Sequence, residues 1–130
     1  MGEYAKVNLR AVEDSAVAYG VQGIEARFPK HLLGCTTGAV SLQRLEPGAR
    51  SPWGHRHERQ EELYVIVSGS GRMNLDGELV DVAPWDAIRV APGTIRAFEA
   101  GPDGLELLAY GAPLGEDSDA ELMSGWWSEP

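Results

Sequence analysis

Three side chains near the middle of the chain have the types and spacing of a divalent-metal site. His55 and His57 are separated by a single residue, and Glu62 follows at the head of the apolar run 63–67. Alternate residues of a strand point to the same face, so this spacing directs both imidazoles to one side and Arg56 to the other. If the next strand pairs back on the first, Glu62 joins them. Two neutral imidazoles and a carboxylate are suitable ligands for Fe(II), Mn, Ni or Zn.

The elements that would position these residues are short strands. Apolar runs of a few residues alternate with clusters of Gly, Pro, Asn and Asp, and no long amphipathic helix lies between them. We expect strands at residues 23–28, 37–45, 62–67, 72–75, 78–82, 87–90, 96–99 and 105–110, with the histidines on a further strand. We expect turns at residues 46–48, 68–71, 76–77, 92–93 and 101–104. The pattern predicts an all-β fold, most simply a jelly-roll barrel.

Composition and charge limit the class of protein. The chain has 130 residues, the usual size of one domain, and a net charge of −9. Lys and Arg form no basic stripe, so we expect no nucleic-acid partner, and no apolar run has the length of a membrane span. Cys35 is the single cysteine, which excludes an intrachain disulfide. Residues 1–14 lack the apolar region of a signal peptide, and a cytoplasmic location is expected.

The order of these residues resembles the cupin superfamily, in particular the small bacterial single-domain cupins of the cupin-2 type. The first cupin motif is matched by Gly48, His55, His57, Glu62 and Gly69, with one extra residue before the first histidine. The second motif is similar to residues 84–86 and 91–96, which read Pro-Trp-Asp and Ala-Pro-Gly-Thr-Ile-Arg.

The resemblance covers roughly residues 37–111 and implies a single cupin domain over residues 1–130. Its barrel core would be residues 37–111, with an N-terminal arm at 1–36 and a C-terminal tail at 112–130. The resemblance implies no particular reaction.

The end of the second motif departs from the pattern of metal-binding cupins. In those proteins the residue three after the glycine is a histidine, the fourth ligand, whereas this chain has Arg96. A guanidinium offers no lone pair to a metal. Arg96 therefore has three interpretations. In the first, its side chain points into the barrel and pairs with Glu62. In the second, it holds a substrate carboxylate or phosphate beside a three-ligand metal. In the third, it lies outside the barrel as a surface charge. The apolar Phe98, two residues further on, favours an inward side chain.

Other residues are candidates for the wall of a substrate pocket. With Arg96, the substrate-binding candidates are Tyr64, Trp53 and Phe98. Tyr64 shares the expected inner face with Glu62, where its hydroxyl either binds a ligand or is satisfied within the core. Trp53 precedes the histidines and would line the mouth of the pocket.

Several residues outside this set have simpler interpretations. Glu61 is a second candidate carboxylate but is expected at the rim, and Met73 and Trp85 are expected in the core or the pocket wall. The tail carries Trp126 and Trp127, so we expect it to dock on the barrel or on a partner subunit. The edges and apolar outer faces of an open jelly roll predict a homodimer.

Three functional hypotheses follow from these observations. The first is a cupin with a metal at His55, His57 and Glu62 that binds or converts a small polar or anionic molecule. Open metal positions suit oxygenase, isomerase or hydrolase chemistry. The second is a metal-free binding barrel in which Arg96 pairs with Glu62. The third is an interaction protein whose dimer and tail matter more than its pocket.

Overall fold

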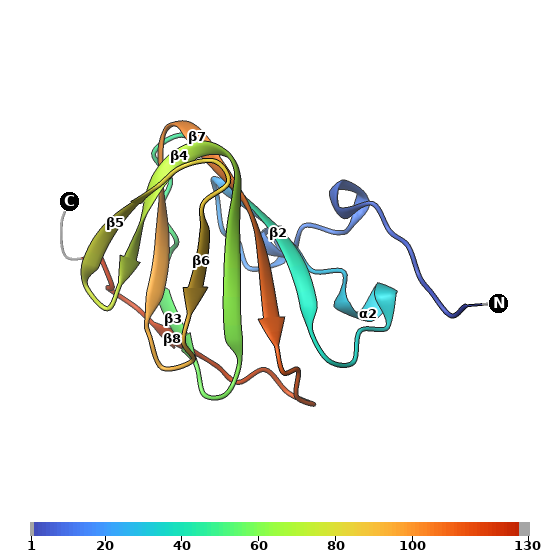
Figure 1. Cartoon of the computed structure of the whole chain (residues 1–130). Coiled ribbons are helices and arrows are strands. Elements are labelled where there is room, and N and C mark those ends of the chain that lie inside the picture. The colour runs from blue at the N-terminus through green and yellow to red at the C-terminus, as the bar shows by residue number, and fades with distance from the viewer. Residues whose placement is uncertain (1, 128–130) are drawn as a thin grey trace.

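The antiparallel strands of this protein curl into a jelly-roll barrel (Figure 1). The structure is a computed structural model that describes residues 2–127. The strands of this part of the chain are β1 (Ile24–Arg27), β2 (Ala39–Leu45), β3 (Gly54–His57), β4 (Glu61–Leu75), β5 (Glu78–Val82), β6 (Ala87–Val90), β7 (Arg96–Ala112) and β8 (Ala120–Met123). The order β1-β2-β7-β3-β8 forms one path, and β4 pairs with β5, β6 and β7. The all-β jelly-roll prediction is confirmed.

Two long strands give the barrel its curvature. β4 and β7 pair along most of their length and arch over the top of the molecule in Figure 1. The first half of β4 also pairs with β6, and the second half pairs with β5. Each long strand therefore takes part in both walls of the barrel.

The turns expected at residues 68–71 and 101–104 are wrong, because both segments lie within the continuous strands β4 and β7. The register of β4 against β7 shifts between Ile66 and Ser68 and again between Gly69 and Gly71. Gly69 has a φ of +81°, and a Cβ there would lie 2.0 Å from the carbonyl oxygen of Gly104. The glycines allow bulges and close backbone approach, which bend the strands without reversing them.

The hairpin predicted at residues 76–77 is confirmed. Asp76 and Gly77 both have positive φ values, 52° and 93°, as the tight turn between β4 and β5 requires. The side-chain oxygen of Asn74 accepts a hydrogen bond from the Gly77 N–H over 2.8 Å. The neighbouring expectation for Trp85 is wrong, because this side chain is 76% exposed and belongs to neither the core nor a pocket wall.

The N-terminal segment contains short helical pieces and packs on the barrel. These are η1 (Leu9–Ala11), α1 (Ser15–Ala18) and α2 (Lys30–Leu33). Arg10 donates to both carboxylate oxygens of Glu106 on β7, each over 3.1 Å. None of the helices in residues 2–127 is long and apolar enough to cross a membrane.

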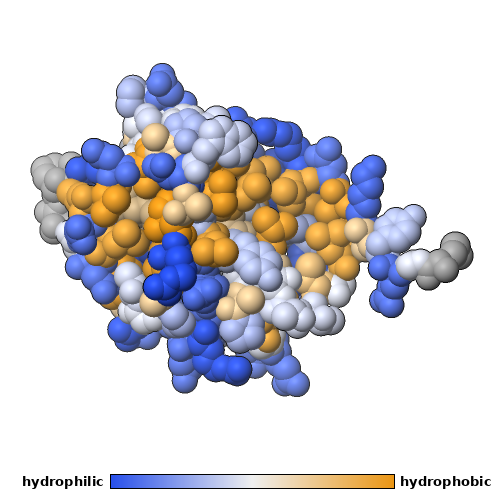
Figure 2. All heavy atoms as spheres, viewed as in Figure 1, coloured by the Kyte–Doolittle hydropathy of each residue, from blue (hydrophilic) through white to orange (hydrophobic). Residues whose placement is uncertain are grey.

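The core lies between the two walls, and an apolar band lies outside. Tyr64, Ile66, Met73 and Leu107 are at most 1% exposed and form the centre of the core. Figure 2 shows apolar residues in a band across the outer face of the molecule, with hydrophilic residues above and below it. Tyr64 and Ile66, which alternate along β4 after Glu62, are both buried in this core. The inner face of β4 is therefore apolar beyond Glu62, which confirms the strand parity expected from the sequence.

The C-terminal tail docks on its own barrel, one of the two outcomes expected for it. β8 pairs antiparallel with β3, so that His55 lies opposite Leu122 and His57 lies opposite Ala120. The indole nitrogen of Trp127 donates to the carbonyl oxygen of Ser51 over 3.2 Å. The strand that carries both histidines therefore lies between β7 and the tail.

Candidate metal centre

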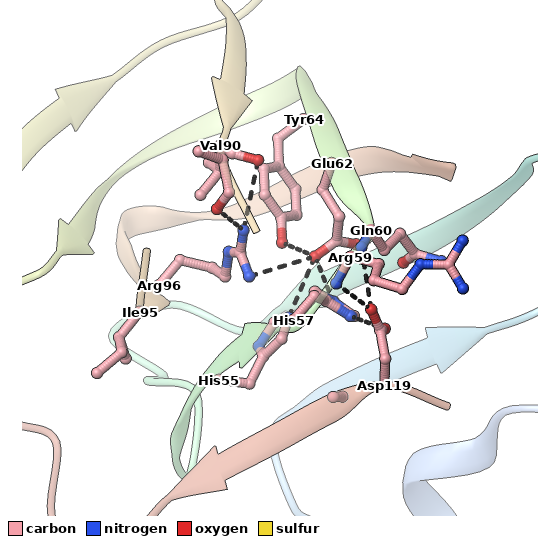
Figure 3. Close-up of polar contacts among 12 residues, drawn as sticks. His55, His57, Arg59, Gln60, Glu62, Tyr64, Val90, Ile95, Arg96 and Asp119 are labelled. Atoms are coloured by element: carbon pink, nitrogen blue, oxygen red, sulfur yellow. Dashed lines mark hydrogen bonds and ion pairs between the residues drawn. The ribbon is translucent and has the colours of Figure 1, made fainter. Parts of the chain in front are cut away.

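One carboxylate oxygen lies at the centre of the polar cluster inside the barrel (Figure 3). Oε1 of Glu62 lies 3.2 Å from Nε2 of His55 and 2.9 Å from Nε2 of His57. Tyr64 donates its hydroxyl hydrogen to the same oxygen over 2.7 Å. One potential ligand atom from each of His55, His57 and Glu62 lies within 4.8 Å of the others. The two strands that the sequence pointed to thus bring these three side chains together.

The second nitrogen of His57 contacts a residue of the tail. Nδ1 lies 2.7 Å from Oδ1 of Asp119, which directly precedes β8. The other oxygen, Oδ2, accepts the backbone N–H groups of Arg59 and Gln60 over 2.7 and 2.9 Å. Asp119 therefore joins the tail to the turn between β3 and β4, next to the proposed ligands.

The electrostatics of the cluster favour a cation between these groups. Burial opposes the charged form of His57, but its hydrogen bonds to Glu62 and Asp119 outweigh burial and raise its pKa. Burial also opposes the charge of Glu62, yet the bonds from His55, His57 and Tyr64 hold the pKa of this carboxyl well below its usual range. Glu62 is thus an anion whose neighbours are arranged to supply positive charge.

The donor set fits a divalent metal held by three protein ligands. Ligands at about 2.1 Å from a common ion, at right angles to one another, are about 3 Å apart. The separations from Glu62 to the two imidazole nitrogens are of this size. Because Asp119 accepts only, its partner Nδ1 carries a hydrogen, and the lone pair of Nε2 can face Glu62. A proton or a metal ion between Nε2 and the carboxylate relieves the repulsion of two lone pairs at this distance.

Arg96 points into the barrel, as the first interpretation from the sequence expected. Its side chain is completely buried, so the alternative of a solvated surface charge is wrong. NH2 donates to the carbonyl oxygen of Ala91 over 3.0 Å, and NH1 lies 4.0 Å from Oε1 of Glu62. Nε and NH1 have no hydrogen-bond partner among the described residues. The buried guanidinium of Arg96 is therefore directed at the Glu62 carboxylate and has N–H groups that donate no hydrogen bond to the described residues.

Tyr64 and Phe98 form the apolar back of the site. Their rings lie edge to face with centroids 5.0 Å apart, and both side chains are buried. Burial, followed by the charge of Glu62, raises the pKa of the Tyr64 hydroxyl well above its usual range. Tyr64 stays neutral and donates a hydrogen bond to the Glu62 carboxylate, which it helps to orient. Its side chain is not part of the cavity wall.

A cavity of about 710 Å³ leads to the cluster. The three candidate ligands and Arg96 line one part of it, together with Trp53 and Phe98, as the sequence predicted for the pocket wall. Most of the remaining wall is apolar and comes largely from α1, β1, β2 and the segments beside them, including Val21, Ile24, Ala26 and Phe28. The space is large enough for a small organic molecule with a polar end at the cluster and an apolar body.

Sequence reasoning missed Asp119. The tail carries many acidic residues, and nothing in their spacing marks one of them as a partner of His57. Glu61, the second candidate carboxylate, lies at the surface and forms an ion pair with Arg89 over 3.5 Å, which agrees with the rim position expected for it. The pairing of β3 with β8 is the feature that would have identified Asp119.

The fold and cluster define a class: small antiparallel jelly-roll barrels with a His, His, Glu set on the inner wall. The family model described as Cupin domain matches residues 41–109, which is more than half of the chain. The chain belongs to the cupin family, as the sequence motifs indicated.

One curated relative matches part of the chain, and several solved structures share its fold. An uncharacterized protein of Methanocaldococcus jannaschii is 34% identical over 70 residues, so the match spans 53% of this chain and only 56% of that relative. A cupin protein from Bacteroides fragilis has a TM-score of 0.72 at 27% identity, over 91% of each chain. The polyketide cyclase RemF from Streptomyces resistomycificus has a TM-score of 0.74 at 22% identity, over 99% of this chain and 89% of that one.

A third solved structure, a variant of the Streptomyces protein PAC13, is bound to uridine. It has a TM-score of 0.73 at 23% identity, over 95% of this chain and 93% of that one. At such identities RemF and PAC13 show a shared fold alone.

Proposed function

We propose that this cupin binds one divalent metal ion through His55, His57 and Glu62 and holds a small monoanionic molecule beside it. The observation that supports this most is the convergence of three ligand atoms at the polar part of the cavity. A bound ion would supply Lewis acidity and orient an oxygen of the ligand. With protein ligands at three positions, the open positions suit oxygenase or isomerase chemistry.

The charge of the cluster argues for a monoanion. Glu62 and Asp119 are two carboxylates, Arg96 is one cation, and Tyr64 is neutral. A divalent ion brings this set to a net charge of plus one, which a single negative charge on the ligand neutralises. Balanced charge matters here because an uncompensated charge in a largely buried site is costly.

The rest of the cavity indicates what the anion is attached to. Arg96 has a hydrogen on NH1 that points toward the cluster and can be donated to the ligand. A bidentate grip would require NH2 to leave the carbonyl of Ala91, so a single hydrogen bond is the geometry we expect. Trp53 and Phe98 would contact the apolar body of the molecule. The candidate ligands are therefore small organic acids with an apolar part.

Elemental analysis tests the metal site. Protein purified without a chelator and without a nickel column is expected to contain, or to take up on reconstitution, about one equivalent of a transition metal. The double substitution His55→Ala and His57→Ala should abolish uptake, while His31→Ala, an exposed histidine on α2, should not. Less than about a tenth of an equivalent in the reconstituted wild type would overturn the proposal.

A second function is favoured by the position of Arg96. Its buried guanidinium occupies the place where metal-binding cupins have a fourth ligand, and it lies 4.0 Å from Glu62. In this alternative the barrel is a metal-free binding module in which His57 carries a proton and Arg96 pairs with Glu62. Titration with small organic acids in a chelator distinguishes the two: unchanged affinity favours the metal-free module, and loss of binding favours the metal site.

A further inference from the structure

The tail of this protein delivers a side chain to the candidate metal centre. Asp119 reaches His57 from the opposite side to Glu62, with 2.7 Å between Oδ1 and Nδ1 (Figure 3). Its second oxygen is held by the two backbone N–H groups of Arg59 and Gln60. The Asp119 carboxylate thus contacts the His57 ring through one oxygen and two backbone N–H groups through the other, and these three contacts fix its orientation.

This contact determines which nitrogen of His57 carries hydrogen. Both ring nitrogens lie beside carboxylate oxygens, which can only accept, so the single hydrogen of the neutral ring goes to one of the two. The contact of Nδ1 with Asp119 is the shorter one, and Oε1 of Glu62 already accepts the hydroxyl hydrogen of Tyr64, so the hydrogen belongs on Nδ1. The lone pair of the neutral ring is then on Nε2, which lies 2.9 Å from Oε1 of Glu62. A hydrogen-bond acceptor on the far nitrogen is the arrangement that orients a metal-binding imidazole and raises its basicity.

The position of Asp119 is set by contacts that do not involve the imidazole of His57. β8 follows Asp119 directly and pairs with β3 over four residue pairs. Farther along, Trp127 donates to the carbonyl of Ser51, and the guanidinium of Arg50 lies 4.8 Å from the centre of its ring. Gly54 allows this approach, because a Cβ there would lie 2.7 Å from Trp126. The docked tail therefore holds Asp119 in place.

We propose that Asp119 is a positioning residue, which fixes His57 with hydrogen on Nδ1 and the Nε2 lone pair aimed at the metal position, so that the site is complete only when the tail is docked. The part that concerns metal rests on the proposed function. The part that concerns the tautomer of His57 does not, and the two are measured separately.

Nitrogen NMR of the metal-free protein reads the tautomer directly. In chelator-treated protein labelled with ¹⁵N-histidine, at a pH where the imidazoles are neutral, His57 is expected to carry hydrogen on Nδ1. Asp119→Ala should shift His57 toward the Nε2–H form. The matched control is Glu121→Gln on the same tail, which loses an exposed ion pair with Arg56 and should leave the tautomer unchanged. Hydrogen on Nε2 in the wild type would overturn the proposal, whether or not any variant folds.

Zn²⁺ titration of the same proteins tests the consequence for binding. Asp119→Ala should weaken Zn²⁺ affinity by about 10–100-fold, the usual effect of removing such a partner. Glu121→Gln should stay within about twofold of the wild type. Equal affinity in Asp119→Ala, with the tautomer changed, would overturn the positioning role. Absence of Zn²⁺ binding in the wild type would instead overturn the proposed metal site, and the tautomer would still decide the role of Asp119.

Discussion

A single residue, Arg96, separates this centre from a four-ligand metal site. Arg96 is the register partner of His55 across β3 and β7. Directly opposed residues of antiparallel strands share a face with their Cβ atoms about 5 Å apart. A histidine at this position would thus present its ring beside His55 and could add a fourth ligand.

We therefore expect Arg96→His to raise metal affinity by at least about tenfold, since a fourth protein ligand replaces a nearby cation. Calorimetric titration with Zn²⁺ measures the change. Arg96→Leu is the matched control, because it removes the cation without adding a donor atom. If the Zn²⁺ affinity of the two variants rises equally, removal of the charge explains the effect and residue 96 supplies no ligand.

The pH dependence of stability should reveal the charged form of His57. Its pKa is raised in the folded protein, so its charge stabilises the fold fully below the unfolded value of 6.5, and this contribution is lost as pH rises through the folded pKa. In chelator-treated protein, the stability advantage of the wild type over His57→Gln should therefore shrink with increasing pH. Urea unfolding at a series of pH values measures it, with His31→Gln as the exposed control. A constant difference would mean that His57 is not charged in the folded state.

At the scale of elements, one glycine within β4 and one in the turn after it show how this residue type serves two purposes. Gly77 lies in a hairpin turn, where a Cβ would contact nothing within 4 Å, although its φ is +93°. Gly69 has a similar φ, but a Cβ there would overlap the backbone of Gly104 on β7. The first position needs conformational freedom alone, and the second also needs the missing side chain.

Gly69→Ala should therefore destabilise the protein by roughly 3 kcal/mol or more, since both strain and a backbone clash must be relieved. Gly77→Ala should cost only about 1–2 kcal/mol, the penalty for a left-handed residue. Urea unfolding compares the two variants with the wild type. Similar losses in both would show that the close approach of β4 and β7 contributes little.

Glycine occurs both in turns and within bent strands, and this explains why some elements were predicted from the sequence and others were not. Alternating apolar residues identified the strands on both sides of residues 68–71, but glycine and serine there indicate a turn and a bulge equally well. The long-range pairing of β4 with β7 decides between them, and local sequence does not encode that pairing. β8 was missed for a related reason, because its four residues become a strand only by docking beside β3.

At the site, strand parity and the cupin motif were sufficient for the residues of the barrel wall. They placed His55, His57 and Glu62 on one face and favoured an inward Arg96 among three interpretations. They could not predict the contact of Asp119 with His57, because Asp119 lies in a tail whose path depends on the folded barrel. Short-range spacing thus predicts ligands on neighbouring strands but not a partner supplied by a distant segment.

At the scale of the whole molecule, the outer face carries an apolar row that a single chain leaves exposed. Leu63 on β4 is the register partner of Tyr110 on β7, and Tyr110 is in turn the partner of Val40 on β2. Leu63 and Tyr110 are 40% and 44% exposed. A row of exposed apolar side chains of this kind is typical of contacts between subunits.

We therefore expect a homodimer at micromolar concentration, with this row in the contact. Leu63→Glu places a charge in the row and should weaken dimerisation by at least about tenfold, because a buried unpaired charge is costly. Leu79→Glu on β5, at 43% exposure, is the matched control outside the row and should leave the dimer intact. Sedimentation velocity measures both variants. A monomeric wild type would refute the dimer, whereas a dimer unaffected by Leu63→Glu would place the contact on another face.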